Sequence, residues 1–230
     1  MIRRVLAEAI GTGLLVAAVV GSGIAASRLS PGDVGLQLLE NAIATAAALV
    51  AIIIALGPVS GAHLNPVITL VDLALGGQGP RPAFAYIVAQ VVGGAIGAVL
   101  ANLMFELPPV TFSAHLRSGT HLWFAEVVAT AGLVLVVFGA GRSGRSGMAP
   151  FAVGSYVAAA YFFTSSTSLA NPAVTLARTL SDTFAGIAPS SSLAFIGAQI
   201  VGGAVGLVLV RALYPRSDAV ADAEVLPRAH

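Results

Sequence analysis

Two Asn-Pro pairs are the residues whose type and spacing could carry chemistry. The first lies in the segment Ser60–Val67, which reads Ser-Gly-Ala-His-Leu-Asn-Pro-Val, and the second is Asn171-Pro172-Ala173. An Asn side chain caps a helix through its oxygen and keeps amide N–H groups to donate, while Pro suits a first helical turn because its missing N–H is not needed there. The pairs therefore predict two helix starts that offer hydrogen bonds to a polar solute.

Composition argues against covalent catalysis and metal binding. The chain has no Cys, which excludes disulfides and thiolate ligands, and its four histidines have no metal-ligand spacing. No Ser-His-acid grouping or phosphate-binding loop is present, so we expect neither an enzyme nor a cofactor. The chain has 11 Lys and Arg against 10 acids, so no basic patch is available for nucleic acid. The histidines are His63, His115, His121 and His230.

The elements that position the Asn-Pro pairs are membrane helices. Of the 230 residues, 57% are hydrophobic and 9% charged, and the mean hydropathy is +0.93. A lipid bilayer is the expected solvent for such a chain. The first apolar run is long enough to cross about 30 Å of hydrocarbon and is not a secretory signal. The predicted spans are 4–26, 36–57, 82–105, 121–141, 147–165 and 190–213.

Two further apolar stretches, 65–76 and 171–181, are too short to span the bilayer and begin at the Asn-Pro pairs. They predict half-helices that enter the membrane and stop. Non-helical backbone at that depth is tolerated only where protein buries it or where it lines a watery cavity. We therefore expect the loops before the half-helices to line an aqueous path with carbonyl acceptors and the Asn65 and Asn171 amides. The positive helix ends would oppose cations there.

An internal duplication relates the two halves of the chain. Each half holds three spans, an odd number, so the second half must cross the membrane in the opposite direction and the repeats are inverted. The predicted division is a first repeat over 1–112, a second over 113–214 and a polar tail over 215–230. The matching pairs are Ala7-Glu8 with Ala125-Glu126, Asn65–Leu70 with Asn171–Leu176, and Gln90–Gly97 with Gln199–Gly206.

Arginine placement predicts the orientation. With both termini in the cytoplasm, eight arginines fall on the cytoplasmic side and three outside, as the positive-inside rule requires. The localisation expected is therefore the inner membrane, with lipid as the surrounding partner. The cytoplasmic arginines are Arg3, Arg4, Arg81, Arg142, Arg145, Arg211, Arg216 and Arg228, and the outer ones are Arg28, Arg117 and Arg178.

At this point the sequence resembles the aquaporin and aquaglyceroporin family, the major intrinsic proteins. The resemblance covers the chain to about Tyr214 and depends on the duplicated Asn-Pro motif (Asn65-Pro66-Val67 and Asn171-Pro172-Ala173) and on Glu8 and Glu126. It implies an all-α, right-handed bundle of six helices and two half-helices, one pore per subunit and a homotetramer. It also implies that the two glutamates brace the re-entrant loops and that His63 lines the inner vestibule.

The sequence departs from the family pattern at the constriction. The Arg that usually follows the second Asn-Pro-Ala is Val174 here, and spacing from the motifs assigns the other filter positions to Thr45, Ala159 and Ser168. These small, uncharged residues predict a wide filter that admits glycerol-like polyols and undissociated metalloid hydroxides such as arsenite, as in divergent bacterial members of the family. A plain water channel and, in another class, a secondary transporter are the alternatives.

Overall fold

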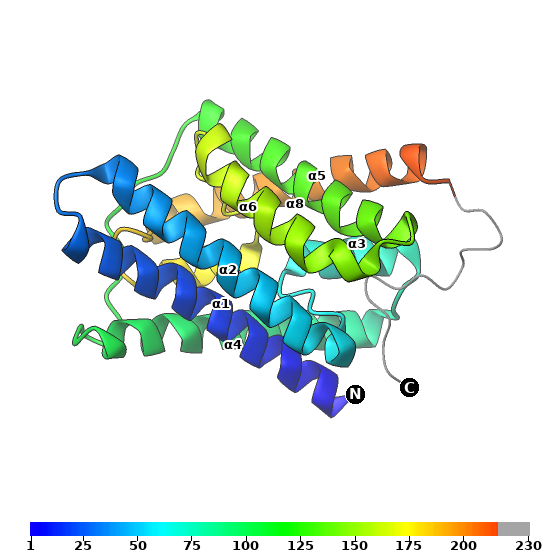
Figure 1. Ribbon diagram of the computed structural model, residues 1–230, viewed down its shortest axis with the longest axis horizontal. Helices are drawn as coiled ribbons and strands as arrows, with labels where there is room; N and C mark the ends of the chain where they lie inside the picture. The colour runs from blue at the N-terminus through cyan, green and yellow to red at the C-terminus, as the bar shows by residue number, and fades with distance from the viewer. Residues whose placement is uncertain (216–230) are drawn as a thin grey trace.

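The computed structural model describes residues 1–215, and this part of the chain contains helices but no strand (Figure 1). From residue 216 onward the predicted tail, with Arg216, Arg228 and His230, lies outside the described residues. The elements are α1 (Ile2–Leu29), α2 (Val34–Ser60), α3 (Pro66–Leu75), α4 (Pro80–Met104), α5 (Thr120–Arg142), η1 (Ser146–Met148), α6 (Ala149–Phe163), α7 (Pro172–Arg178) and α8 (Pro189–Leu213).

Five described helices, α1, α2, α4, α5 and α8, are long and apolar enough to cross a membrane. The sixth predicted span, 147–165, is shorter than expected because α6 starts at Ala149 and ends before Thr164, which has extended backbone. Its 15 residues cover about 22 Å. The 3₁₀ turn η1 adds about 6 Å, so the two elements together approach the thickness of the hydrocarbon layer.

Each half-helix packs across the boundary between the two halves of the chain. Within the halves, α1 packs on α2 and α4, as α5 packs on α6 and α8. Helix α3 packs on α4 of its own half and on α8 of the other, while α7 packs on α8 and on α4. The two half-helices therefore connect the halves by packing against long helices of both.

Glycines allow the long helices of each half to approach closely. A Cβ atom at Gly93 of α4 would overlap the backbone of Ala9 in α1, and one at Gly97 would overlap the backbone of Gly13. In the second half, a Cβ at Gly202 of α8 would lie 2.6 Å from the Val127 carbonyl oxygen in α5. Small residues at such crossings are typical of membrane helices. The close crossing brings polar side chains of α1 and α4, and of α5 and α8, within hydrogen-bonding reach.

Candidate functional site

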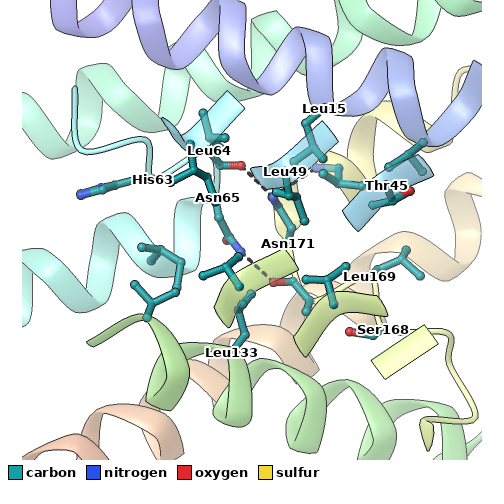
Figure 2. Close-up of a pocket in the computed structure, with 18 of the residues that line it drawn as sticks. Leu15, Thr45, Leu49, His63, Leu64, Asn65, Leu133, Ser168, Leu169 and Asn171 are labelled. Atoms are coloured by element: carbon teal, nitrogen blue, oxygen red, sulfur yellow. Dashed lines mark hydrogen bonds between the residues drawn. The ribbon is translucent and has the colours of Figure 1, made fainter. Parts of the chain in front are cut away.

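Asn65 and Asn171, the first residues of the two Asn-Pro pairs, lie close together at the wall of one cavity (Figure 2). Asn65 Nδ2 donates to the Ala170 carbonyl at 2.8 Å, and Asn171 Nδ2 donates to the Leu64 carbonyl at 2.7 Å. The Oδ1 atoms cap their own helices by accepting from backbone N–H groups, that of Val67 at 2.9 Å in α3 and that of Ala173 at 3.0 Å in α7. The starts of α3 and α7 thus face each other, and the cap leaves a second N–H on each amide for a solute.

A buried carboxylate holds the first re-entrant loop. Glu8 Oε1 accepts from Ser60 Oγ at 2.7 Å and from the His63 backbone N–H at 3.0 Å. Its Oε2 accepts from the Leu64 backbone N–H at 2.8 Å and from Gln90 Nε2 at 2.7 Å. Four donors from three elements therefore converge on one carboxylate that has no solvent exposure, and this fixes the loop between α1 and α4.

The second loop repeats this arrangement bond for bond. Glu126 Oε1 accepts from Ser166 Oγ at 2.6 Å and from the Leu169 backbone N–H at 2.9 Å. Its Oε2 accepts from the Ala170 backbone N–H at 2.8 Å and from Gln199 Nε2 at 2.7 Å. The duplication seen in the sequence is thus also present in the hydrogen bonds.

The loops are strained, which explains why each needs a brace. Ala62 and Leu64 have φ values of 46° and 52°, and Ser168 and Ala170 have 51° and 47°. A non-glycine residue in this left-handed region costs about 1–2 kcal/mol. The strained turns orient the Leu64 and Ala170 carbonyls so that each accepts a hydrogen bond from the Asn amide of the other half. The charge-assisted bonds to the buried glutamates offset the strain.

A cavity of about 80 Å³ surrounds the Asn pair, which is room for several water molecules. Most of its wall is Leu, Val and Ile from α1, α2, α3, α5, α6 and α7, with Leu and Ala from the two re-entrant loops, so polar groups are few and lie at defined places. The polar wall residues are Thr45, His63, Asn65, Tyr161, Ser168, Asn171 and Arg178.

Three of the four predicted filter residues lie at this wall: Thr45, Ser168 and Val174. Ala159 does not, because it is exposed on the opposite face of α6. Tyr161, which is absent from the predicted filter, takes the place at the wall and its hydroxyl lies 3.2 Å from Thr45 Oγ1.

The helical phase of α6 explains the difference. Val153, Val157 and Tyr161 recur every four residues and face the cavity, whereas Ala159 is two residues, or about 200°, from both Val157 and Tyr161. This four-residue apolar and aromatic pattern is the signal in the sequence that could have identified Tyr161.

His63 lies at the cavity wall and is also held by neighbours. Its Nδ1 is 3.1 Å from Thr69 Oγ1, and its Nε2 is 3.8 Å from Asp72 Oδ2. Its ring packs edge-on against Tyr86 with centroids 5.4 Å apart. The side chain therefore has a fixed orientation at the end of the cavity nearer α3.

The other end of the cavity has one arginine at its wall and a second nearby, and the predicted site contains neither. Arg178 closes α7, lines the cavity and donates through Nε to the Ala185 carbonyl. Arg117, from the loop between α4 and α5, donates through Nε to the Gly186 carbonyl at 3.2 Å. Burial lowers the pKa of the Arg117 guanidinium, and the nearby Glu126 carboxylate opposes that shift. An Arg side chain stays charged under such a shift.

The fold and this centre define a multi-pass membrane channel for small solutes, with its path between two opposed half-helices. The sequence profile of the family described as Major intrinsic protein matches residues 1–169, and the chain belongs to that family. It is 49% identical over 209 residues to aquaglyceroporin AqpS of Rhizobium meliloti (strain 1021), covering 91% of this chain and 89% of that protein.

Two further comparisons agree with this assignment. The chain is 32% identical over 236 residues to aquaporin Z of Rhodopseudomonas palustris, covering 95% of this chain and 96% of that protein. Its fold matches the X-ray structure of the aquaglyceroporin from Plasmodium falciparum with a TM-score of 0.70 at 20% identity, over 91% of this chain and 95% of that chain. The predicted family and the aquaporin-like helical bundle are thus confirmed, and the chain is a channel rather than an enzyme.

Proposed function

We propose that the protein passively conducts water and uncharged hydroxylated solutes larger than water, namely glycerol-like polyols and undissociated metalloid hydroxides such as arsenite. The observation that carries this proposal is Val174 at the cavity wall, one residue after Asn171-Pro172-Ala173. The family usually has Arg at this position. A valine neither narrows the path nor binds water through charged donors, so a larger neutral solute can pass.

The wall suits solutes that have a polar side and an apolar side. Val153 and Val157 provide an apolar strip, while Ser168 and the Asn pair provide hydrogen-bonding groups. The Ser168 hydroxyl oxygen is buried and has no hydrogen-bond partner among the described residues, so a solute hydroxyl can bond to it. Polyols and metalloid hydroxides share this amphipathic shape and their hydrogen bonding.

With Tyr161 at the wall, the proposed filter is narrower than one with Ala159 would be. The filter remains uncharged. Its hydroxyl is tied to Thr45 at 3.2 Å, which holds the ring on the side of the cavity formed by α2 and α6. The proposed filter is therefore Thr45, Tyr161, Ser168 and Val174.

The test is Val174→Arg in reconstituted vesicles, with stopped-flow swelling for water and glycerol and an uptake assay for arsenite. The long charged side chain should lower glycerol and arsenite flux by tenfold or more and retain water flux. Val174→Met, long but uncharged, is the matched control that separates length from charge. Glycerol and arsenite fluxes that stay at the parent level in Val174→Arg would refute the assignment of the filter.

A plain water channel is the second candidate, favoured by the aromatic ring of Tyr161 in the filter and by the similarity to aquaporin Z. The ratio of glycerol to water permeability separates the two candidates. A secondary transporter would instead show flux that saturates and depends on a proton or sodium gradient.

We also propose a homotetramer in the inner membrane with both termini in the cytoplasm. Large apolar side chains are exposed along the long helices, among them Leu14, Ile43, Val92 and Leu193, and lipid or neighbouring subunits would cover them. Because the chain has no native Cys, single cysteines at Gly32 and Ser143 can be labelled without background. An impermeant reagent should label Gly32→Cys and not Ser143→Cys in intact cells, and light scattering should give the mass of four subunits.

A further inference from the structure

Among residues 1–215, Arg178 is the one Lys, Arg, Asp or Glu at the wall of the cavity. It is 4% exposed and ends α7, four residues after Val174. Residues four apart lie on the same face of a helix, and four residues rise about 6 Å. Because α7 starts at the central Asn171, Arg178 lies about one helical turn beyond Val174, toward the mouth of the pore.

The guanidinium is held in place but its charge is not paired. Its Nε donates to the Ala185 carbonyl, and its terminal nitrogens have no partner among the described residues. Asp182 is the acid nearest in sequence, but its Oδ1 accepts from the Ala114 backbone N–H at 2.9 Å and from Ser113 Oγ at 3.4 Å. Within residues 1–215, the one contact within 4 Å between an acid and a basic side chain is that of Asp72 with His63, 3.8 Å long and at the opposite end of the cavity.

A second arginine strengthens the positive potential at this mouth. The loop between α4 and α5 folds over α7, where the backbone N–H groups of Thr111 and Ser113 donate to the carbonyls that follow Arg178 at 3.1 and 3.0 Å. This loop carries Arg117, which is close enough for its charge to repel that of Arg178, while Glu126 offsets part of the repulsion from inside the bundle.

We infer that Arg178 is the cation-excluding residue of this pore, so that charge selection occurs one helical turn outside the neutral filter that selects by size. A fixed charge about 5 Å from a passing cation, at an effective dielectric of about 20, slows its passage on the order of a hundredfold. The inference depends on the chain being a channel and not on which neutral solute it carries.

The test measures potassium and proton leak through proteoliposomes, normalised to water flux so that only open pores count. Arg178→Gln keeps an amide that can donate to the Ala185 carbonyl but removes the charge, and it should raise the normalised leak by tenfold or more. Arg178→Lys keeps the charge and should stay as tight as the parent. Arg178→Gln with the parent's normalised leak would overturn the inference.

If Arg178→Gln does not assemble, Val174→Arg in the presence of Arg178 decides the matter. If Arg178 already excludes cations in the parent, a second arginine at position 174 should leave the cation leak unchanged. A tenfold fall in leak on adding it would show that Arg178 was not excluding cations. The same variant reports on the filter through glycerol flux, so failure of the proposed function and failure of this inference give different results.

Discussion

Replacing Glu126 by Gln tests whether the buried glutamates hold the re-entrant loops. Gln has the same shape but presents one acceptor oxygen and one NH₂ donor in place of two acceptors. The Ser166 hydroxyl and the Gln199 amide can reorient to accept a hydrogen bond. The backbone N–H groups of Leu169 and Ala170 cannot, and they bond to different carboxylate oxygens. In either orientation of the new amide, one of these buried N–H groups faces another donor.

The expected cost follows from this count of bonds. An orphaned buried N–H costs about 1–3 kcal/mol, and the two bonds that the amide oxygen still accepts lose their charge assistance, which weakens each by about 1 kcal/mol. The total is about 3–5 kcal/mol. For a chain of this length, such a loss lowers the melting temperature on the order of 10 °C.

The assay is thermal unfolding of the purified protein in detergent, combined with glycerol flux in vesicles. Glu106→Gln is the matched control, because that carboxylate is exposed and makes no hydrogen bond to a described residue. Glu8→Gln should behave like Glu126→Gln, since its four bonds have the same pattern. If Glu126→Gln melts like Glu106→Gln and alters only the pH dependence of flux, the residue relays protons and is not a brace.

Two further pairs of variants test the filter and the helix packing. Tyr161→Ala should raise the flux of a four-carbon polyol severalfold, because the ring lies at the cavity wall, whereas Ala159→Leu on the exposed face of α6 should leave that flux unchanged; vesicle swelling measures both. Gly93→Ala should destabilise the protein by about 1–3 kcal/mol because its Cβ would overlap the backbone of Ala9. Gly197→Ala meets nothing within 4 Å and should gain about 0.5–1 kcal/mol from helix propensity; thermal unfolding compares the two.

The centre of the pore could be predicted from the sequence because it is built from short motifs that occur twice. An Asn before a Pro specifies its own helix start, and its repetition in an inverted half predicts a facing partner. The span limits were predicted to within three residues, since apolar runs end at Gly, Pro and charged residues. The second half-helix also differs by three residues, because it ends at Arg178 and not at 181.

The wall of the filter could be predicted only in part. Val174 directly follows its motif, and counting back from Asn65 to Thr45 crosses only the short loop 61–64, whereas counting back from Asn171 to α6 crosses the longer non-helical segment 164–170. One residue of error turns a helical side chain by about 100°, which is enough to exchange a wall position for an exposed one. Ala159 and Tyr161 are two residues, or about 200°, apart, so they lie on opposite faces of α6. Arg178 was predicted to lie on the outer side but not at the cavity wall, because its place there depends on contacts with distant segments of the chain, which leave no periodic pattern in the sequence.

The duplication explains why the middle of the pore is symmetric and its mouths are not. Asp72 and Arg178 each follow the Asn of their own half by seven residues, so the repeat places them at equivalent positions with opposite charge. Asp72 lies 3.8 Å from His63, whereas the residue equivalent to His63 in the second half is Leu169, which cannot pair with Arg178. In each loop, Glu8 or Glu126 accepts from two backbone N–H groups, which any residue type supplies. These bonds therefore place little restriction on which side chains stand at the positions of Asp72 and Arg178. One scaffold can therefore keep a fixed neutral centre while the charge at each mouth is set independently.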